Sequence, residues 1–352
     1  MKKKSLYITL CLSAIIALSA CGGKEETKAE ESKTTIIVEA ETEEDNDGLP
    51  EGQMYSYLTG EPVDIEIGTQ RPFAIMINNI YDAMPQSGIS QAEILYECLV
   101  ESDITRLMGV FQDIEDLNKV GSIRSARHDY IEFAKDQEAI FTHYGQSVFA
   151  QNVIDAGYPT ISGLTGYGED VFYRGSDFPA PHNVFTDKEG LLLGLEYTGL
   201  TREYSEGYES RLTFNSEDTV AETGNTANKV TLPFVYSNPW FEYDAETGLY
   251  KRFQYETEHI DAVNGEQLTF ENLIIQYASY EVISNDGHKD FHLVGSGDGL
   301  WISNGKAVEI RWERASENDK TTYVYADGSP VNLNPGKSYI AIVPTDTPVV
   351  YE

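Results

Sequence analysis

Two kinds of hydrophobic pattern divide the chain. In the first, continuous apolar runs alternate with segments whose apolar residues recur at helical spacing. The runs predict buried strands at residues 71–79, 106–111 and 139–144. The helical spacing predicts helices at residues 90–99, after residue 125, and at 148–156. Because alternating strands and helices are typical of a parallel sheet covered by helices, we expect an α/β N-terminal domain with a largely parallel sheet.

Three polar positions predict where helices begin. Ser90 and Glu93 have the spacing of a capping box, in which each side chain bonds a free backbone N–H of the other. Ser125 precedes an amphipathic segment and is expected to be its N-cap. A further cap is expected at residues 186–189, before a short helix.

The second pattern is a period-two alternation after residue 228, which predicts a mainly antiparallel β C-terminal domain. Hairpins are expected at 243–250, with Gly248 in the left-handed conformation, at 301–312, with a turn at Asn304-Gly305, and at 321–333. Residues 215–228 read as a linker. We therefore expect domains at 53–222 and 223–352, each with its own core.

The N-terminus predicts a bacterial lipoprotein signal at residues 1–20. Three lysines are followed by a short apolar run and by Leu18-Ser-Ala-Cys21, so cleavage would leave Cys21 as an acylated N-terminus, with palmitate among its lipids. Residues 21–52 are rich in Glu and Thr and are expected to form a disordered acidic spacer. The predicted location is the extracytoplasmic face of the cell membrane, with the lipid as the contact to the membrane.

The charge of the chain limits its partners. The formal net charge is −33, and removal of residues 1–20, with three lysines and no acidic residue, would take it to −36. Such a surface repels nucleic acid, so we expect no nucleic-acid partner and consider a cell-wall component or an envelope protein instead.

A basic segment stands out against this acidic background. Arg124, Arg127 and His128 lie within five residues, at the predicted start of a helix, where cations are unfavourable unless an anion is bound. The alternative is that these arginines form structural ion pairs with nearby acids.

Other polar residues follow the predicted strands, where the sheet of an α/β domain places its ligand site. Arginine suits this role because its guanidinium fork fits phosphate and carboxylate. The candidate ligand-binding residues are Asn78, Asn79, Arg106, Arg124, Arg127, His143, Arg174, His182 and Asn183. For each there is a structural alternative: Arg106 pairs with an acid, His143 lies in the core, or His182 braces its loop.

The order of several motifs resembles that of the YerB-like lipoproteins of Gram-positive bacteria. The resemblance rests on residues 71–79, 85–97, 105–106, 120–127 and 181–183, and extends to 295–301 and 334–340. It implies a two-domain envelope lipoprotein and implies no particular activity.

Three functions remain open at this point. The first is an extracytoplasmic binding or regulatory protein whose arginine-rich cleft holds an anionic ligand. The second is an enzyme, a hydrolase or transferase acting on an anionic wall component, with His143 or His182 as acid or base. The third is a protein-interaction scaffold. The sequence contains no P-loop, zinc motif or nucleophile elbow, which argues against the enzyme. We expect no cofactor and no metal.

Overall fold

The computed structural model describes residues 49–221 and 223–352. The predicted signal peptide, Cys21 and most of the predicted spacer lie outside these residues. Residues 48–352 form one compact unit. Within the described residues, no helix is long and apolar enough to cross a membrane.

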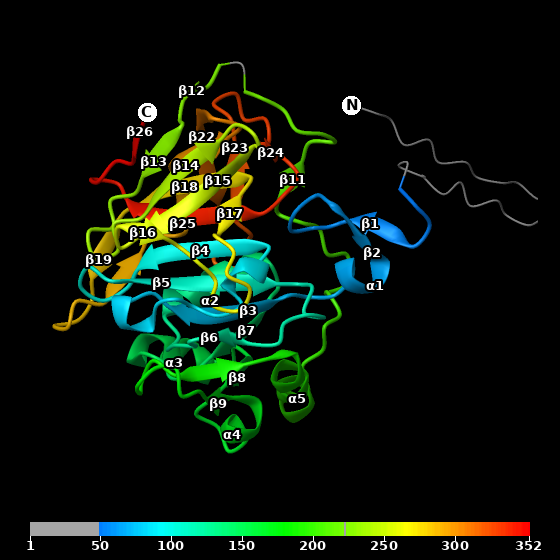
Figure 1. Ribbon diagram of the computed structural model, residues 1–352, viewed down its shortest axis with the longest axis vertical. Coiled ribbons are helices and arrows are strands. Elements are labelled where there is room, and N and C mark those ends of the chain that lie inside the picture. The colour runs from blue at the N-terminus through cyan, green and yellow to red at the C-terminus, as the bar shows by residue number, and fades with distance from the viewer. Residues whose placement is uncertain (1–48, 222) are drawn as a thin grey trace, which may run out of the picture. The chain divides into compact units, whose positions relative to one another are not determined.

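One sheet of eleven strands runs through both halves of the chain. Ten of its strands follow the order β12-β22-β21-β18-β25-β4-β5-β3-β7-β8, and β23 pairs with β22. These strands are β3 (Phe73–Asn78), β4 (Ile94–Leu99), β5 (Thr105–Phe111), β7 (Ile140–His143), β8 (Thr160–Ser162), β12 (Asn225–Thr226), β18 (Asn272–Ala278), β21 (Gly295–Ser303), β22 (Lys306–Arg314), β23 (Thr322–Val324) and β25 (Ser338–Pro344). The halves join where β25 pairs in parallel with β4, and Figure 1 shows these two strands side by side.

The N-terminal part of this sheet is mixed, so the expected largely parallel sheet is wrong. β5 is antiparallel to both β3 and β4, whereas β7 is parallel to β3 and to β8. The difference arises at residues 94–99, where we expected a helix and the structure has β4. Without a helical crossover, β4 returns directly into β5 as an antiparallel neighbour.

The residues of the expected capping box do not cap a helix in the structure. Ser90 lies in the short 3₁₀ turn η2 (Ile89–Gln91), and the carboxylate of Glu93 accepts hydrogen bonds from the backbone N–H groups of Gln112 and Asp113. Every residue of β4 is buried, because both faces of the strand are covered. A short apolar run of this kind fits a buried strand as well as a helix, and here the strand forms.

Among the residues that the structure describes, three helices have two turns or more: α2 (His128–Asp136), α3 (Val148–Asp155) and α5 (Lys188–Thr198). Shorter turns are α1 (Ile65–Gly68), α4 (Gly168–Val171) and the 3₁₀ turn η1 (Tyr81–Ala83). Figure 1 shows α3, α4 and α5 gathered around β8 at one end of the sheet.

One expected helix cap differs from the structure, and another lies within the expected residues 186–189. The N-cap of α2 is Arg127 rather than Ser125, and its side chain makes no capping hydrogen bond. The N-cap of α5 is Asp187, whose carboxylate accepts from Gly190 N at 2.9 Å. Thr186 is not part of this cap, because its hydroxyl donates to Val171 O instead.

The C-terminal half contains a second, antiparallel sheet, which agrees with the expected mainly antiparallel β architecture. Its strands are β13 (Lys229–Thr231), β14 (Trp240–Asp244), β15 (Leu249–Gln254), β16 (Thr257–Glu258), β17 (Thr269–Phe270) and β26 (Val350–Tyr351). The expected hairpins form β14–β15 and β21–β22, and Gly248, Asn304 and Gly305 have positive φ. At the third expected hairpin, residues 321–333, β23 is followed by one isolated β-bridge, between Val324 and Pro330.

Short strands complete the structure in small sheets. They are β1 (Gln53–Tyr55) with β2 (Pro62–Asp64), β6 (Val120–Gly121) and β9 (Tyr173–Arg174) with β10 (Val184–Thr186), β11 (Thr213–Phe214) with β24 (Asn332–Leu333), and β19 (Tyr280–Val282) with β20 (Lys289–Phe291). The pairing of β11 with β24 connects a segment before residue 222 to the last part of the chain.

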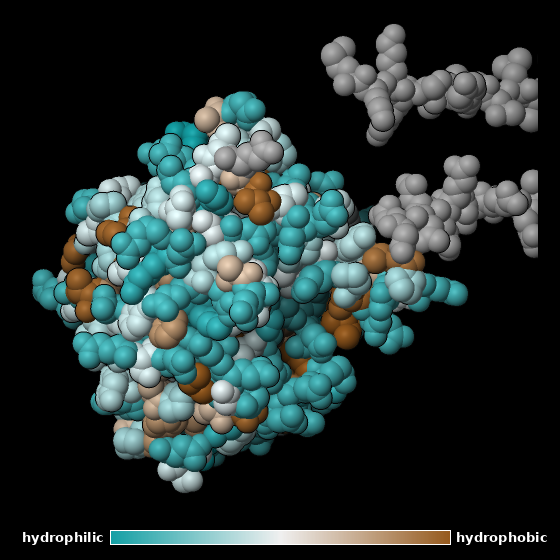
Figure 2. Space-filling model, turned by 45° about the horizontal axis from the view of Figure 1, so that its top comes forward, coloured by the Kyte–Doolittle hydropathy of each residue, from teal (hydrophilic) through white to brown (hydrophobic). Residues whose placement is uncertain are grey.

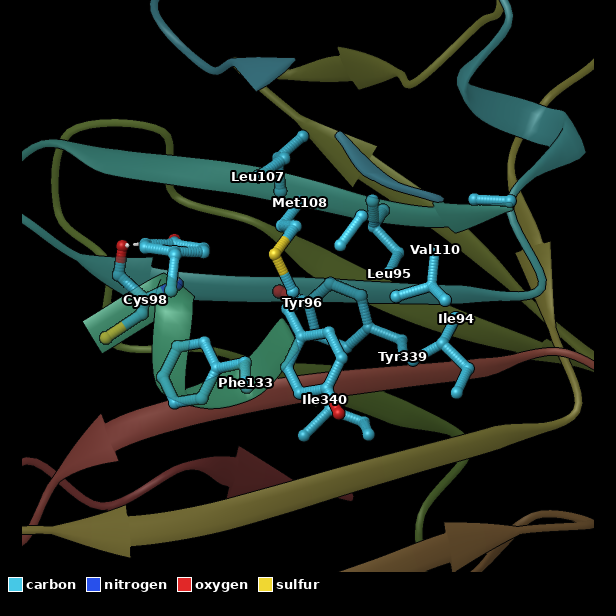
Figure 3. Close-up of a cluster of buried hydrophobic side chains, with 14 of the residues drawn as sticks. Ile94, Leu95, Tyr96, Cys98, Leu107, Met108, Val110, Phe133, Tyr339 and Ile340 are labelled. Atoms are coloured by element: carbon cyan, nitrogen blue, oxygen red, sulfur yellow. Dashed lines mark hydrogen bonds between the residues drawn. The ribbon is translucent and has the colours of Figure 1, made fainter. Parts of the chain in front are cut away.

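The buried side chains form one core across both halves, so the expectation of two independent cores is wrong. Figure 3 shows Tyr339 and Ile340 of β25 among residues of β4 and β5. Phe133 of α2 stacks on Tyr96 of β4, with ring centroids 5.3 Å apart. Because β25 covers one edge of β4, the halves share apolar surface that neither could bury alone. The domain boundary near residue 222 stays a prediction.

A buried polar network crosses the same junction. Glu97 of β4 accepts hydrogen bonds from Arg252 Nη2 and from the hydroxyl of Tyr339, both at 2.6 Å. Arg252 also donates to Nδ1 of His259, whose Nε2–H donates to Gln86 Oε1 at 2.7 Å. Burial and the charge of Arg252 lower the pKa of His259 well below its usual value, so the ring is neutral. The network therefore starts and ends in the N-terminal half and passes through the C-terminal half.

The shared core leads to a prediction about fragments. We expect residues 53–222 expressed alone to be insoluble, because loss of β25 exposes the apolar edge of β4 and leaves Glu97 buried without Arg252. Co-expression with residues 223–352 should restore a soluble complex, and the 48–352 chain is the control. A soluble, monomeric 53–222 fragment with cooperative urea unfolding would contradict the shared core.

Candidate functional site

The basic segment predicted as a site lies across the end of β3. β7 pairs only with Phe73–Ile75, so the last residues of β3 are free to pair with other chain segments. Asn78 N donates to Ser122 O at 2.9 Å, and Arg124 N donates to Met76 O at 3.0 Å. Arg106 of β5 faces Asn78 in the strand register. The strand ends thus bring together an asparagine, a serine and two arginines from three separate parts of the sequence.

Arg106, Arg124 and Arg127 form a cluster, in which Arg106 and Arg127 pair with the same acid, Glu101. Arg127 binds Glu101 through two hydrogen bonds, Nε to Oε2 at 2.8 Å and Nη2 to Oε1 at 2.5 Å. Arg106 Nη2 lies 3.7 Å from the same carboxylate. Two guanidinium groups therefore face one carboxylate, and Arg124 adds a third positive charge nearby, so the cluster has an excess of positive charge.

Burial and the neighbouring charges change the pKa values of the groups in this cluster. Arg106 is only 2% exposed, and its burial, followed by the charge of Arg127, lowers its pKa to about 10. Burial and the charge of Arg127 also lower the pKa of Arg124. Burial opposes ionisation of Glu101, but the hydrogen bonds and charge of Arg127, together with the charge of Arg106, outweigh it and lower the pKa of Glu101. Arg106 and Glu101 are therefore both charged near neutral pH.

Several buried polar atoms in and beside the arginine cluster have no hydrogen-bond partner among the described residues. They are Asn78 Oδ1, Arg106 Nε, Ser122 Oγ and Arg124 Nε. Buried polar groups in proteins are nearly always hydrogen-bonded, because an unmet group costs about 1–3 kcal/mol. These atoms provide donors and acceptors for a ligand that reaches the cluster.

A later loop brings His182 to the same cluster. Asn78 Nδ2 donates to His182 Nδ1 at 2.9 Å, and Arg124 Nη1 donates to Pro181 O at 3.5 Å. Burial and then the charge of Arg124 lower the pKa of His182. The ring is neutral near pH 7, and because Nδ1 accepts from Asn78, Nε2 carries the proton.

The structure assigns Arg127 to a bracing position within the cluster. Besides Glu101, its Nη1 donates to Ser125 O at 3.1 Å and Ala126 O at 3.0 Å. These hydrogen bonds occupy every nitrogen of the guanidinium. Arg127 therefore holds the segment before α2 in place, whereas Arg124 makes a single long side-chain hydrogen bond among the described residues.

The remaining predicted residues lie in other environments. Asn79 is fully buried and donates to Glu97 and Thr105, so it belongs to the network between the halves. His143 is fully buried, with Gly145 O and Thr160 Oγ1 at its two nitrogens, and burial lowers its pKa to about 4. Neither residue is joined to the arginine cluster by a hydrogen bond in the described residues.

Arg174 and Asn183 form a pair of their own. Arg174 Nη1 donates to Asn183 Oδ1 at 2.8 Å, and its guanidinium lies over the ring of Tyr144 at 5.3 Å. The backbone N–H of Tyr144 donates to Arg124 O, and Asn183 directly follows His182, so the pair lies next to the cluster.

Two members of the site were missed in the sequence. Glu101 follows β4 in a short turn, and no local pattern distinguishes it from the other acidic residues. Ser122 lies in the basic segment, but its burial depends on pairing with β3. Glu97, the centre of the network between the halves, had a visible signal, since it is the one acidic residue inside the apolar run 94–100.

Two matched substitutions distinguish Arg127, which holds the segment before α2 in place, from Arg124, which is available to bind a ligand. Arg127→Gln should lower the free energy of unfolding by about 1–3 kcal/mol, because Glu101 and two carbonyl groups lose their donor. Arg124→Gln should change it by less than about 0.5 kcal/mol or raise it, because one long hydrogen bond is lost and repulsion from Arg127 is relieved. Urea unfolding of both variants measures the difference, and an equal or larger loss for Arg124→Gln would contradict these roles.

The chain is similar to a protein of known structure. It is 29% identical over 291 residues to the Bacillus subtilis (strain 168) protein named "Putative lipoprotein YerB", covering 82% of this chain and 85% of that protein. The crystal structure of YerB protein from Bacillus subtilis matches with a TM-score of 0.73 at 28% identity, covering 84% of this chain and 99% of the other.

Two family models cover most of the chain. Residues 58–201 match the N-terminal domain, and residues 230–340 the C-terminal domain, of a family described as "Protein of unknown function (DUF3048)". Together with the similarity to YerB, these matches confirm the resemblance found in the sequence motifs. The chain therefore belongs to the DUF3048 family and is similar to the YerB lipoprotein.

Proposed function

We propose that this protein is a lipid-anchored binding or regulatory protein of the bacterial cell envelope, with an anionic ligand held at the arginine cluster. The anchor would be the lipid on Cys21, and the folded part would lie on the extracytoplasmic side. The lipoprotein name of the Bacillus relative and the Leu18-Ser-Ala-Cys21 motif support this placement. The face in Figure 2 is mostly hydrophilic, with scattered hydrophobic residues, which suits a domain surrounded by water.

The observation that carries the proposal is the buried excess of positive charge in a strongly acidic chain. The formal net charge is −33, yet Arg106 and Arg127 share one carboxylate and Arg124 adds a third positive charge beside them. A purely structural cluster would be expected to match its charges, because an uncompensated buried charge is costly. A bound carboxylate or phosphate would supply the missing negative charge and accept from the unpartnered guanidinium atoms.

Each residue would have a distinct part in binding. Half-buried Arg124 would contact the anion, and the more deeply buried Arg106 would attract it through its positive charge. His182 would donate from Nε2, and Asn78 Oδ1 and Ser122 Oγ would be free to bond a hydroxyl or amide of the ligand. This combination of an anion site with neutral donors and acceptors suits a wall glycan, a peptide or a protein segment.

The site favours binding over catalysis. His143, one of the two histidines considered as acid or base, is enclosed and has partners at both nitrogens. His182 would remain as the proton carrier, but its Nδ1 accepts a hydrogen bond from Asn78, and the charge of Arg124 lowers its pKa.

Binding of inorganic sulfate and of soluble muropeptide fragments to the purified 48–352 chain would test the proposal. At a ligand concentration ten times the Kd, wild type should gain about 1.4 kcal/mol of stability in thermal unfolding. Arg124→Gln should abolish this gain. The matched control is Arg311→Gln, which removes the same charge from an exposed position on β22 and should respond like wild type.

The pH dependence provides a second readout in the same experiment. An anion beside His182 raises the pKa that burial and Arg124 have lowered, so the complex binds a proton more readily than the free protein. Sulfate binding should therefore strengthen as the pH falls from 7 to about 5.5, and His182→Gln should remove this dependence. No stabilisation of wild type by either probe, or equal stabilisation of Arg124→Gln, would contradict the proposed site.

A further inference from the structure

A second polar cluster lies where α2 meets β20, beside a cavity of about 420 Å³. His128 and Asp129 begin α2, and Asp290 lies in the middle of β20. The backbone N–H of Phe291 donates to Asp129 Oδ1 at 3.1 Å, which fixes β20 against the start of the helix. The cluster therefore joins one residue of the C-terminal half to two of the N-terminal half.

The distances within this cluster fit donors around a single metal ion. His128 Nε2 lies 3.2 Å from Asp290 Oδ1 and 3.7 Å from Asp129 Oδ1, and one ligand atom from each residue lies within 4.8 Å of the others. Ligands at about 2.1 Å from a metal lie about 3.0 Å apart in octahedral geometry and about 3.4 Å apart in tetrahedral geometry. The cluster needs little rearrangement to take such an ion.

The charges around Asp129 call for a cation. Its side chain is only 3% exposed, and no lysine or arginine of residues 49–221 or 223–352 forms an ion pair with it. Nearby Glu132 already has its own partners, Arg314 at 2.8 Å and Lys135 at 2.6 Å. Asp129 is therefore a carboxylate more than nine-tenths buried, at the wall of the cavity, without a cationic partner.

A further observation agrees with this. His128 Nδ1 is buried without a hydrogen-bond partner in the described part of the chain.

We propose that His128 Nε2 and the carboxylates of Asp129 and Asp290 bind a divalent transition-metal ion such as Zn²⁺. An imidazole with two carboxylates is a ligand set that Zn²⁺ accepts, whereas Mg²⁺ and Ca²⁺ prefer oxygen ligands alone. The cavity side of the ion would be open to water or to a group of a ligand. Because its ligands come from both halves, the ion would also hold β20 against α2.

Isothermal titration of the chelator-treated 48–352 chain with ZnCl₂ and with MgCl₂ tests this site. Wild type should bind one Zn²⁺ and respond far more weakly to Mg²⁺. Asp290→Asn should weaken Zn²⁺ binding at least tenfold. The side chain of Asp290 is 43% exposed and this variant should remain folded, which its thermal unfolding without metal checks.

A second variant and a matched control make the result specific. Asp129→Asn can still accept the hydrogen bond from Phe291 N–H but supplies no charge, so it should lose Zn²⁺ binding while staying folded. Glu317→Gln removes an exposed acid from the wall of the same cavity and should bind Zn²⁺ within twofold of wild type. Zn²⁺ binding that is absent in wild type, or that persists unchanged in both aspartate variants, would overturn the site, since the ion would then bind elsewhere on the acidic surface.

Discussion

The carboxylate of Glu97 lies in β4 with none of its surface exposed, and a charge in that position is stable only when donors surround it. Oε1 accepts from Asn79 Nδ2 at 3.0 Å and from the Thr105 hydroxyl at 2.7 Å, both in the N-terminal half. Oε2 accepts from Arg252 and Tyr339, both in the C-terminal half. The N-terminal half therefore cannot satisfy its own buried charge, and the two halves have to fold against each other.

This buried network also determines the geometry of the candidate site. Asn79 directly follows Asn78 at the end of β3, and Thr105 directly precedes Arg106 at the start of β5. Successive side chains of a strand point to opposite faces, so the residues that bind Glu97 and those of the arginine cluster lie back to back. The network fixes the strand ends from one side, and the arginine cluster uses them on the other.

The sequence predicted the elements that depend on local pattern. The apolar runs of β3, β5 and β7 and the turns at Gly248 and Asn304-Gly305 were found where expected. β4 was missed because its six apolar-run residues fit a helix and a strand equally well, and a Ser-x-x-Glu pattern preceded them. Its true state depends on pairing with β25, which lies more than 240 residues away.

The candidate site likewise contains residues that local pattern predicts and pairings that it does not. Asn78, Arg106, Arg124 and His182 were predicted together from their positions at strand ends and in loops, and the structure places them in contact or in electrostatic reach of one another. The bidentate pairing of Arg127 with Glu101 could not be predicted, because nothing in the sequence selects one acid among so many. For the same reason, the pairing of Glu97 with Arg252, 155 residues apart, left no trace in local pattern.

A double-mutant cycle on Glu97→Gln and Arg252→Met, measured by urea unfolding of the 48–352 chain, tests the central claim most directly. Each single substitution leaves a buried group without its partner and should lower the free energy of unfolding by about 3–5 kcal/mol. The double variant should be more stable than the sum of the single losses implies, with a coupling energy of at least about 1 kcal/mol. Additive losses, with a coupling energy within about 0.5 kcal/mol of zero, would contradict the account that this ion pair joins the two halves.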